Sequence, residues 1–378
     1  MDQQPTGQEH APQPQPQPQA QPTFQQPARR PGRAGFWIAI IFGVLLLISA
    51  GLNMFFTAGF LAGFEKGGEY KAITDPDTTY SDPAAADTIA VIQISGLINS
   101  EDLETPFGKV FGQVSKFRGQ LQMVKNDKSV RAVIIEVNSP GGEVTASDEI
   151  YHMIDGFKKA NTDIPVIVFM KDYAASGGYY VSAPANRIVA MPTCTTGSIG
   201  VVMTYFNVRT GLEDKLGVKP FIFKSGEMKD AGSPFKKLNE KGELSDADMK
   251  CFEGLIDAAY TGFLKVVYDG RKSKTGWTGP NDDNLKKIAD GSAYTAPQAL
   301  ANNLIDKIGY FEDAVKEAKD AAKITTAKVV RYEYVSPRRL FGLGGASTTK
   351  INTGINVETE AGSLPGIGAP KFMYYWEP

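Results

Sequence analysis

The sequence predicts an α/β protein built on a parallel β-sheet whose faces are covered by helices. Short apolar runs rich in β-branched residues, typical of buried parallel strands, occur at residues 88–94, 130–137 and 164–170. Helical patterns follow the first two runs, over residues 110–124 and from Val144 onward. Strands that alternate with helices over connections of this length form right-handed βαβ units. We therefore expect the strands to end at one common edge of the sheet.

Shorter elements complete the predicted domain. They are strands at residues 187–191 and 221–224, and helices from Ser245 to about Arg271 and near residues 297–303 and 311–322. The first of these helices is long and amphipathic, and Ser245 or Asp246 is suited to cap it. Pro297 is suited to the first turn of the next helix.

Composition divides the chain into five segments. They are a disordered Gln- and Pro-rich leader (1–33), an apolar helix (34–58), a polar linker (59–86), a globular domain (87–336) and a flexible tail (337–378). The leader has too few apolar residues to offset the entropy of an ordered chain. The tail is rich in Gly, Ser and Thr, and we expect it to be loose except for its aromatic end, residues 372–376.

The apolar segment predicts a single membrane-spanning helix. Residues 36–56 form an uncharged run that reaches the ~20 residues a helix needs to cross a bilayer. A cleaved signal peptide is the alternative, although the run is long for a signal core. Arg29, Arg30 and Arg33 precede the run, and only two lysines follow soon after it. This asymmetry predicts a cytoplasmic amino terminus and a globular domain on the outer side of the cytoplasmic (inner) membrane.

Charge and composition argue against several classes of function. The 40 Lys and Arg residues are scattered among 42 Asp and Glu residues, so we expect no nucleic-acid partner. The two cysteines, Cys194 and Cys251, form no disulfide framework or metal-ligand pattern, and we expect no metal or cofactor. The two histidines are His10 in the leader and His152 within a predicted helix. A histidine-based triad is therefore not expected, and a serine nucleophile would need another base.

Three Gly-rich loops follow predicted strands, at residues 139–142 (SPGG), 175–178 (ASGG) and 196–200 (TGSIG). Ser176 lies just past a strand, between small residues that leave its hydroxyl accessible. A Gly-rich loop facing a serine supplies the backbone amides that acyl transfer requires. The alternatives are a tight turn capped by a serine, or an anion-binding nest. Neither the Walker pattern nor G-x-G-x-x-G is present, which disfavours phosphate.

A serine nucleophile needs a group that takes its proton. Without a histidine, that group is best supplied by a lysine that desolvation keeps neutral. The candidates after the last predicted strand are Lys224, Lys229, Lys236 and Lys237. Apolar and small neighbours predict partial burial for Lys229, whereas Lys236 and Lys237 are typical of a solvated pair.

Taken together, these motifs resemble those of the signal peptide peptidase A family. The resemblance is carried by residues 138–142 (NSPGG), 175–180 (ASGGYY), 196–201 (TGSIGV), 224–226 (KSG) and 229–230 (KD). It continues through Tyr294, Ala299 and residues 304–309, and covers the chain from about Asp87 to Lys323 in the family's order and spacing. Members are membrane-anchored serine peptidases, so the resemblance implies that residues 87–336 are a peptidase domain with the Clp protease/crotonase-like fold, a ββα superhelix.

The resemblance also implies roles for individual residues. Ser176 resembles the nucleophile and Lys229 the general base of a Ser/Lys dyad, while Ser198 resembles the serine that orients the lysine. The amides of Gly142 and Gly177 resemble the oxyanion hole. Glu143 follows the paired glycines where some members carry another small residue, so the identity of the oxyanion donors stays open.

The function implied is that of a serine endopeptidase that degrades remnant signal peptides or other hydrophobic peptides at the membrane. Members of similar length assemble into rings or domes of identical subunits, and neighbouring subunits can complete the dyad. Two alternatives are a crotonase-like acyl-CoA enzyme, which shares the Gly-rich loops, and a catalytically inactive membrane scaffold. The membrane segment and the Ser176/Lys229 pair argue against the first, and the filled catalytic positions argue against the second.

Overall fold

The computed structural model describes residues 33–65, 69–77, 79–105, 108–335 and 373–375. The predicted leader lies outside the described residues except for Arg33, and so does the predicted tail except for residues 373–375. The chain forms two units, Met1–Ala62 and Gly63–Pro378.

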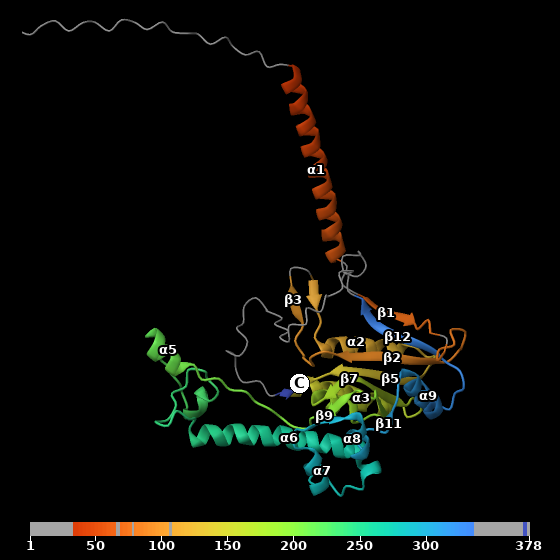
Figure 1. The fold of residues 1–378 in the computed structure, drawn as a ribbon, viewed down its shortest axis with the longest axis vertical. Helices are drawn as coiled ribbons and strands as arrows, with labels where there is room; N and C mark the ends of the chain where they lie inside the picture. Colours follow the sequence, from red (N-terminus) through yellow and green to blue (C-terminus); the bar gives the residue numbers. More distant parts are fainter. Residues whose placement is uncertain (1–32, 66–68, 78, 106–107, 336–372, 376–378) are drawn as a thin grey trace, which may run out of the picture. The chain divides into compact units, whose positions relative to one another are not determined.

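The first unit contains all but the last three residues of helix α1 (Arg33–Glu65), which includes the apolar segment predicted from the sequence (Figure 1). Its described side chains are exposed, as Leu46 and Leu47 illustrate. Among the residues that the structure describes, no helix combines the length and the apolar character needed to cross a membrane. The membrane anchor stays a prediction.

Nine of the described strands of the second unit form one mainly parallel sheet, with the order β1-β12-β2-β5-β7-β8-β11, and with β9 paired to β7 and β10 paired to β9. The strands are β1 (Glu69–Thr74), β2 (Thr88–Ser95), β5 (Val130–Ser139), β7 (Val166–Ala175), β8 (Arg187–Ala190), β9 (Thr195–Gly197), β10 (Ala293–Thr295), β11 (Lys307–Ile308) and β12 (Lys328–Val335). The run from β2 to β8 is parallel, as predicted. Strand β12 extends it beside β2, and β1 closes that edge antiparallel to β12.

Helices cover both faces of this sheet. Alternate residues of a strand point to opposite faces, so each central strand contributes to two buried clusters. Val133 and Ile135 belong to one buried cluster, whereas Ile134 between them belongs to the other. The larger cluster includes residues of α2 (Gln113–Asn126), α3 (Val144–Ala160), α4 (Gly177–Ser182), α6 (Asp246–Thr275), α7 (Asp283–Ile288) and α8 (Ala296–Ala301). The smaller cluster includes residues of α9 (Phe311–Ala322). The α/β fold predicted from the strand and helix patterns is confirmed.

The remaining elements are short. They are β3 (Leu103–Thr105), β4 (Gly108–Val110), β6 (Gly141–Glu143), β13 (Met373–Tyr375), α5 (Arg209–Leu216) and the 3₁₀ helix η1 (Glu227–Asp230). Strand β1 lies in the stretch interpreted as a linker, where a polar sequence gives little sign of a strand. Its partner β12 comes from the other end of the domain.

The strand predicted at residues 221–224 is wrong. These residues form no strand, and Phe221 and Phe223 are 80% and 95% exposed. They belong to a segment, residues 202–245, that we call the arm. Figure 1 shows the arm, with α5, and the first half of α6 extending away from the sheet. The apolar run therefore reflects an exposed surface and not a buried strand.

Candidate active site

Ser176 occupies a sharp turn between β7 and α4. Its backbone has φ 53° and ψ −115°, a combination that non-glycine residues rarely adopt and that is found in strained functional turns. The Ser176 amide donates to the carbonyl of Gly197 at 2.8 Å, and the Ser176 carbonyl accepts from the amide of Tyr180 at 2.9 Å. A strained turn from strand to helix is the geometry by which α/β-hydrolases present their nucleophilic serines.

The register of the sheet places Ser198 next to Ser176. Strand β9 runs parallel to the end of β7 and pairs Gly197 with Ala175, so the residues that follow occupy equivalent positions. Ser198 also has a positive φ, of 48°, and its amide donates to the carbonyl of Ser292 at 2.8 Å. The structure thus brings together two of the serines predicted from the sequence.

The amide of Gly142 points away from Ile98, toward the other side of β6. Ile98 donates to the carbonyl of Gly141 at 2.9 Å and accepts from the amide of Glu143 at 2.8 Å. Because successive residues of a strand direct their backbone groups to opposite sides, Gly142 directs its amide away from Ile98. A Cβ on Gly142 would lie 2.0 Å from the carbonyl oxygen of Ile98, so only glycine fits.

Gly177 begins α4 and lies against the same loop. The position of a Cβ on Gly177 is 3.1 Å from the nitrogen of Gly142 and 3.2 Å from the Cα of Gly141. The carboxylate of Glu143 is directed elsewhere, because it accepts hydrogen bonds from the amide and the hydroxyl of Ser100. Glu143 therefore holds the neighbouring loop, and Gly142 and Gly177 lie close to each other.

An extended segment of the chain itself lies along β6. Strand β13 pairs with β6 antiparallel, with Tyr374 opposite Gly142. It lies on the side to which Gly142 directs its amide, since the other side is occupied by Ile98. The sequence suggested order at the aromatic end of the tail but gave no sign of this partner. The edge of β6 can therefore accept an extended peptide.

Lys229 lies in η1 and its side chain is exposed, which corrects the predicted partial burial. Within the described part of the chain, no hydrogen bond or ion pair joins it to Ser176 or Ser198. The arm that carries it extends away from the sheet (Figure 1). Within the described residues of this chain, the two serines and the two glycines therefore come together without a hydrogen bond or ion pair to the lysine's side chain.

Lys236 is 9% exposed and is not the solvated lysine that the sequence suggested. Its ammonium lies 2.7 Å from Asp248 Oδ1 and 3.1 Å from Asp230 Oδ1. Burial alone would lower the pKa of Lys236, but these two carboxylates outweigh burial and raise it. Lys224 also pairs with Asp230, at 2.8 Å. Both lysines are thus structural cations that hold η1, and Lys236 is unsuited to act as a neutral base.

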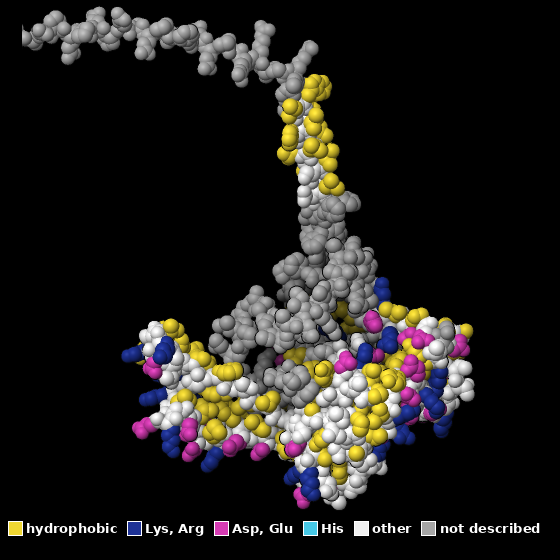
Figure 2. Space-filling model, in the orientation of Figure 1, with side chains coloured by type: hydrophobic (Ala, Val, Ile, Leu, Met, Phe, Trp, Pro, Cys, Tyr) yellow, Lys and Arg dark blue, Asp and Glu magenta, His cyan; other side chains and the backbone are white. Residues whose placement is uncertain are grey.

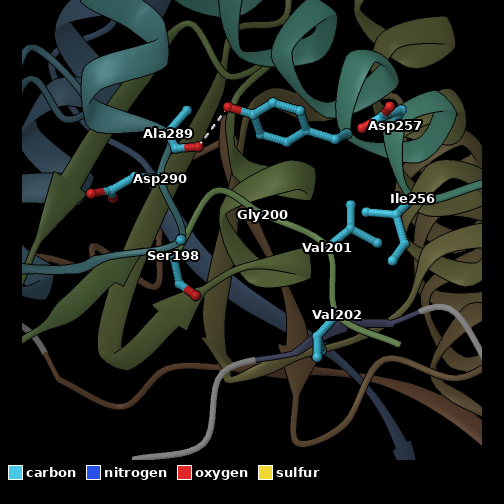
Figure 3. A pocket seen from close by; sticks show the side chains of 10 residues that line it. Ser198, Gly200, Val201, Val202, Ile256, Asp257, Ala289 and Asp290 are labelled. Atoms are coloured by element: carbon cyan, nitrogen blue, oxygen red, sulfur yellow. Dashed lines mark hydrogen bonds between the residues drawn. The ribbon is translucent and has the colours of Figure 1, made fainter. Parts of the chain in front are cut away.

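A cavity of about 370 Å³ opens beside Ser198 (Figure 3). Its lining is formed by Ser198, Gly200, Val201 and Val202 after β9, by Ile256, Asp257 and Tyr260 of α6, and by residues 289–291. The Tyr260 hydroxyl donates to the carbonyl of Ala289 at 2.7 Å and closes one side. Sequence analysis missed this cavity because α6 and the strand β9 lie far apart along the chain. No group of His, Cys, Asp and Glu within the described ranges has the geometry of a metal site.

Comparison with family models gives two overlapping matches. The model of peptidase family S49 matches residues 158–325, which include Ser176, Ser198 and Lys229. The Clp protease model matches residues 110–196. Both matches include the turn at Ser176.

Several curated protein sequences are similar to this chain. A candidate signal peptide peptidase SppA of Enterococcus faecium is 37% identical over 257 residues, which cover 68% of this chain and 70% of that protein. Protease 4 of Salmonella typhi is 36% identical over 256 residues, which cover 68% of this chain but 38% of Protease 4. The chloroplastic serine protease SPPA of Arabidopsis thaliana is 30% identical over 268 residues, covering 69% of this chain and 37% of that protein.

Among solved structures, a mutant of the 1510-N membrane-bound stomatin-specific protease in complex with a substrate peptide is 17% identical. It matches with a TM-score of 0.40 over 68% of this chain and 97% of that chain. The family assignment depends on the sequence relatives. Because the E. faecium relative is 37% identical over 70% of its own length, and because the S49 model spans both serines and the lysine, this chain belongs to the S49 family of serine peptidases, the family of signal peptide peptidase A.

Proposed function

We propose that this S49 serine peptidase is a membrane-anchored endopeptidase that cleaves remnant signal peptides or other hydrophobic peptides, with Ser176 as nucleophile and Lys229 as general base. The observation that carries the proposal is the strained turn at Ser176, which lies beside the amides of Gly142 and Gly177. The pairing of β13 with β6 supports an extended peptide as the occupant of this edge.

In the proposed mechanism, neutral Lys229 takes the proton of the Ser176 hydroxyl, and the serine oxygen attacks the scissile carbonyl. The amides of Gly142 and Gly177 donate hydrogen bonds to the oxygen that becomes negative. The lysine returns the proton to the leaving amine and then activates the water that releases the acyl group. Ser198 accepts a hydrogen bond from the lysine and orients it.

We further propose that a neighbouring copy of the chain supplies Lys229, within a ring or dome of identical subunits. The lysine is exposed on an arm that projects from its own sheet (Figure 1). Figure 2 shows apolar side chains gathered at the surface around α5 and the first half of α6. Within the arm, Leu216, Phe221 and Phe223 are 69%, 80% and 95% exposed. Large apolar side chains at this exposure are typical of surfaces that bind another protein.

The membrane location is proposed from the apolar segment at residues 34–58 and the arginines that precede it. With a cytoplasmic amino terminus, the peptidase domain would lie on the outer side of the cytoplasmic membrane. Hydrophobic segments left there after protein export are substrates that this position would favour.

Mixing two inactive variants tests the proposal. Full-length Ser176→Ala and Lys229→Ala chains, purified in detergent, are each expected to be silent toward an apolar peptide. After mixing at equal amounts and reassembly, about a quarter of the sites should combine an intact serine with an intact lysine, if neighbours complete the dyad. Lys237→Ala is the matched control, since Lys237 is exposed in the same segment, and it should keep full activity.

Three outcomes would contradict parts of this proposal. Full activity of Ser176→Ala would exclude Ser176 as the nucleophile. A silent mixture beside an active wild type and normal assembly would exclude completion of the dyad between subunits. An inert wild-type assembly would favour the scaffold.

A further inference from the structure

Ser147, in the first turns of α3, is fully buried, and its hydroxyl has no hydrogen-bond partner. Among the side chains that the structure describes, Ser147 Oγ is the single buried nitrogen or oxygen atom without a hydrogen-bond partner. Buried polar groups are nearly always paired, and an unpaired one is costly unless it has a role. Nothing in the sequence marks Ser147, because serine is common in the first turns of helices.

The position of Ser147 relates its hydroxyl to the proposed oxyanion hole. A Cβ on Gly177 would lie 2.6 Å from Ser147 Oγ and 3.1 Å from the nitrogen of Gly142. The Ser147 hydroxyl and the Gly142 amide nitrogen therefore both lie within 3.1 Å of the position that a Cβ of Gly177 would occupy. Gly177 directly follows Ser176. A side chain at position 177 would fill that point, and glycine leaves it open.

The other buried hydroxyls around the turn are already engaged. Ser182 donates to the carbonyl of Gly178 at 2.6 Å, and Thr196 donates to the carbonyl of Ala174 at 2.6 Å. Ser139 accepts from the amide of Gly141 at 3.1 Å. Each of these groups supports the backbone of the loops. Ser147 alone among them keeps a donor that the fold does not use.

We propose that Ser147 is a third oxyanion donor, which acts together with the amides of Gly142 and Gly177. Its O–H rotates to donate to the scissile carbonyl oxygen as that oxygen becomes negative, and Ser147 keeps its proton throughout. The proposal rests on the proposed function, since it requires acyl transfer at Ser176. A donor held beside the developing charge in a buried site stabilises the transition state more than the ground state.

This role predicts opposite effects of one substitution on activity and on stability. Ser147→Ala removes a donor that is used in the transition state, so kcat should fall about 100- to 1,000-fold with little change in KM. It also removes an unpaired buried hydroxyl, so the melting temperature should stay the same or rise. If Ser147 had only a structural role, Ser147→Ala would instead lower the melting temperature.

The experiment compares full-length wild type, Ser147→Ala, Ser182→Ala and Ser176→Ala in peptide hydrolysis and thermal unfolding. Ser182→Ala is the matched control, because it loses a hydroxyl that pairs with the backbone: its melting temperature should fall while kcat is kept. The affinity for a peptide aldehyde with apolar side chains, which forms a tetrahedral adduct at the serine, should weaken in Ser147→Ala by the same factor as kcat/KM.

Wild-type kcat and aldehyde affinity in Ser147→Ala, beside a silent Ser176→Ala, would overturn the role of Ser147 and leave the proposed function standing. A parallel loss of kcat and melting temperature in Ser147→Ala would assign Ser147 a structural role and overturn the inference as well. Full activity in Ser176→Ala would instead overturn the proposed function on which the inference rests.

Discussion

The backbone amide of Ser176 donates to the carbonyl oxygen of Gly197 at 2.8 Å, and this bond ties the turn after β7 to the end of β9. A second bond joins the same two strands: the hydroxyl of Thr196 on β9 donates to the carbonyl of Ala174 on β7 at 2.6 Å. The positions of Ser176 and Ser198 are thus set together. Any change that loosens β9 should move both serines.

Thr196→Val tests this coupling. The substitution keeps the shape of the side chain but leaves the buried carbonyl of Ala174 without that donor, which should cost about 1–3 kcal/mol of unfolding free energy. Peptidase kcat should fall as well, because the serines lose their fixed separation. Urea unfolding and steady-state kinetics measure both effects. Thr195→Val, at a partly exposed neighbouring position, should change neither, and equal effects at both positions would contradict the coupling.

Gly177→Ala should lower both activity and stability. The new methyl group would lie 2.6 Å from Ser147 Oγ, so the loop must move. Combined with Ser147→Ala, part of the loss in stability should be recovered, with a coupling of about 0.5–3 kcal/mol in a double-mutant cycle measured by urea unfolding. Gly156→Ala on α3, where no atom outside the local helix backbone lies within 4 Å of the new Cβ, is the control and should stabilise the protein slightly. Strict additivity of the first pair would show that the two residues are not in contact.

Lys236→Met should weaken the attachment of the arm to α6. Asp248 is fully buried, and removing its partner leaves an uncompensated charge at a cost of about 3–5 kcal/mol. Hydrogen exchange in residues 227–250 should quicken, and activity should fall although Lys236 takes no proton. The double variant Lys236→Met/Asp248→Leu should recover much of the protection, whereas Lys237→Met should have no effect. Unchanged exchange in Lys236→Met would mean that the ion pair does not hold the arm.

The buried pair Asp306–Arg271 should make stability depend on acid pH. Asp306 accepts from both terminal nitrogens of Arg271 at 3.1 Å, and also pairs with Lys274. Burial alone would raise the pKa of Asp306, but these cations hold it below the ordinary value. A lowered pKa in the folded state contributes stability above the unfolded pKa of about 3.9, and this contribution is lost as pH falls through the folded pKa.

Asp306→Asn should therefore be less stable than wild type by about 3 kcal/mol at pH 7, and the difference should shrink below pH ~4. Urea unfolding at several pH values measures the trend. Asp155→Asn, which breaks an exposed pair with Lys159, is the control and should cost less than about 1 kcal/mol. A difference that does not vary with pH would show that the Asp306 charge is not the source of the stability.

Removing residues 373–378 should increase kcat/KM for short peptides, because β13 would no longer compete for the edge of β6. Tyr374→Pro should act in the same direction without shortening the chain, since proline cannot donate the amide that an antiparallel strand requires. Hydrolysis of one apolar peptide by the three proteins is the measurement. Unchanged kinetics in both variants would show that β13 does not compete with substrate.

The sequence by itself determined the central strands, the helix over residues 311–322 and the turn at Ser176. These features depend on local patterns: a run of β-branched residues forms a buried strand, and small residues after it allow a tight turn. The order of the Gly-rich motifs also identified the family, because their spacing is carried in the chain itself. Helix α2 begins at Gln113, later than the helical pattern suggested, because residues 108–110 pair with β3.

The tertiary structure alone decided which residues are paired or buried across long separations. Strand β1 depends on β12, and β13 depends on β6, and neither partner is visible in the local sequence. Lys236 looks like a surface lysine until Asp248 is placed against it, and the apolar run at 221–224 looks like a strand although these residues form none in the structure. Ser147 acquires significance only because Gly177 brings the loop of Gly142 against it. Burial and partnership depend on residues distant in sequence, which local periodicity does not encode.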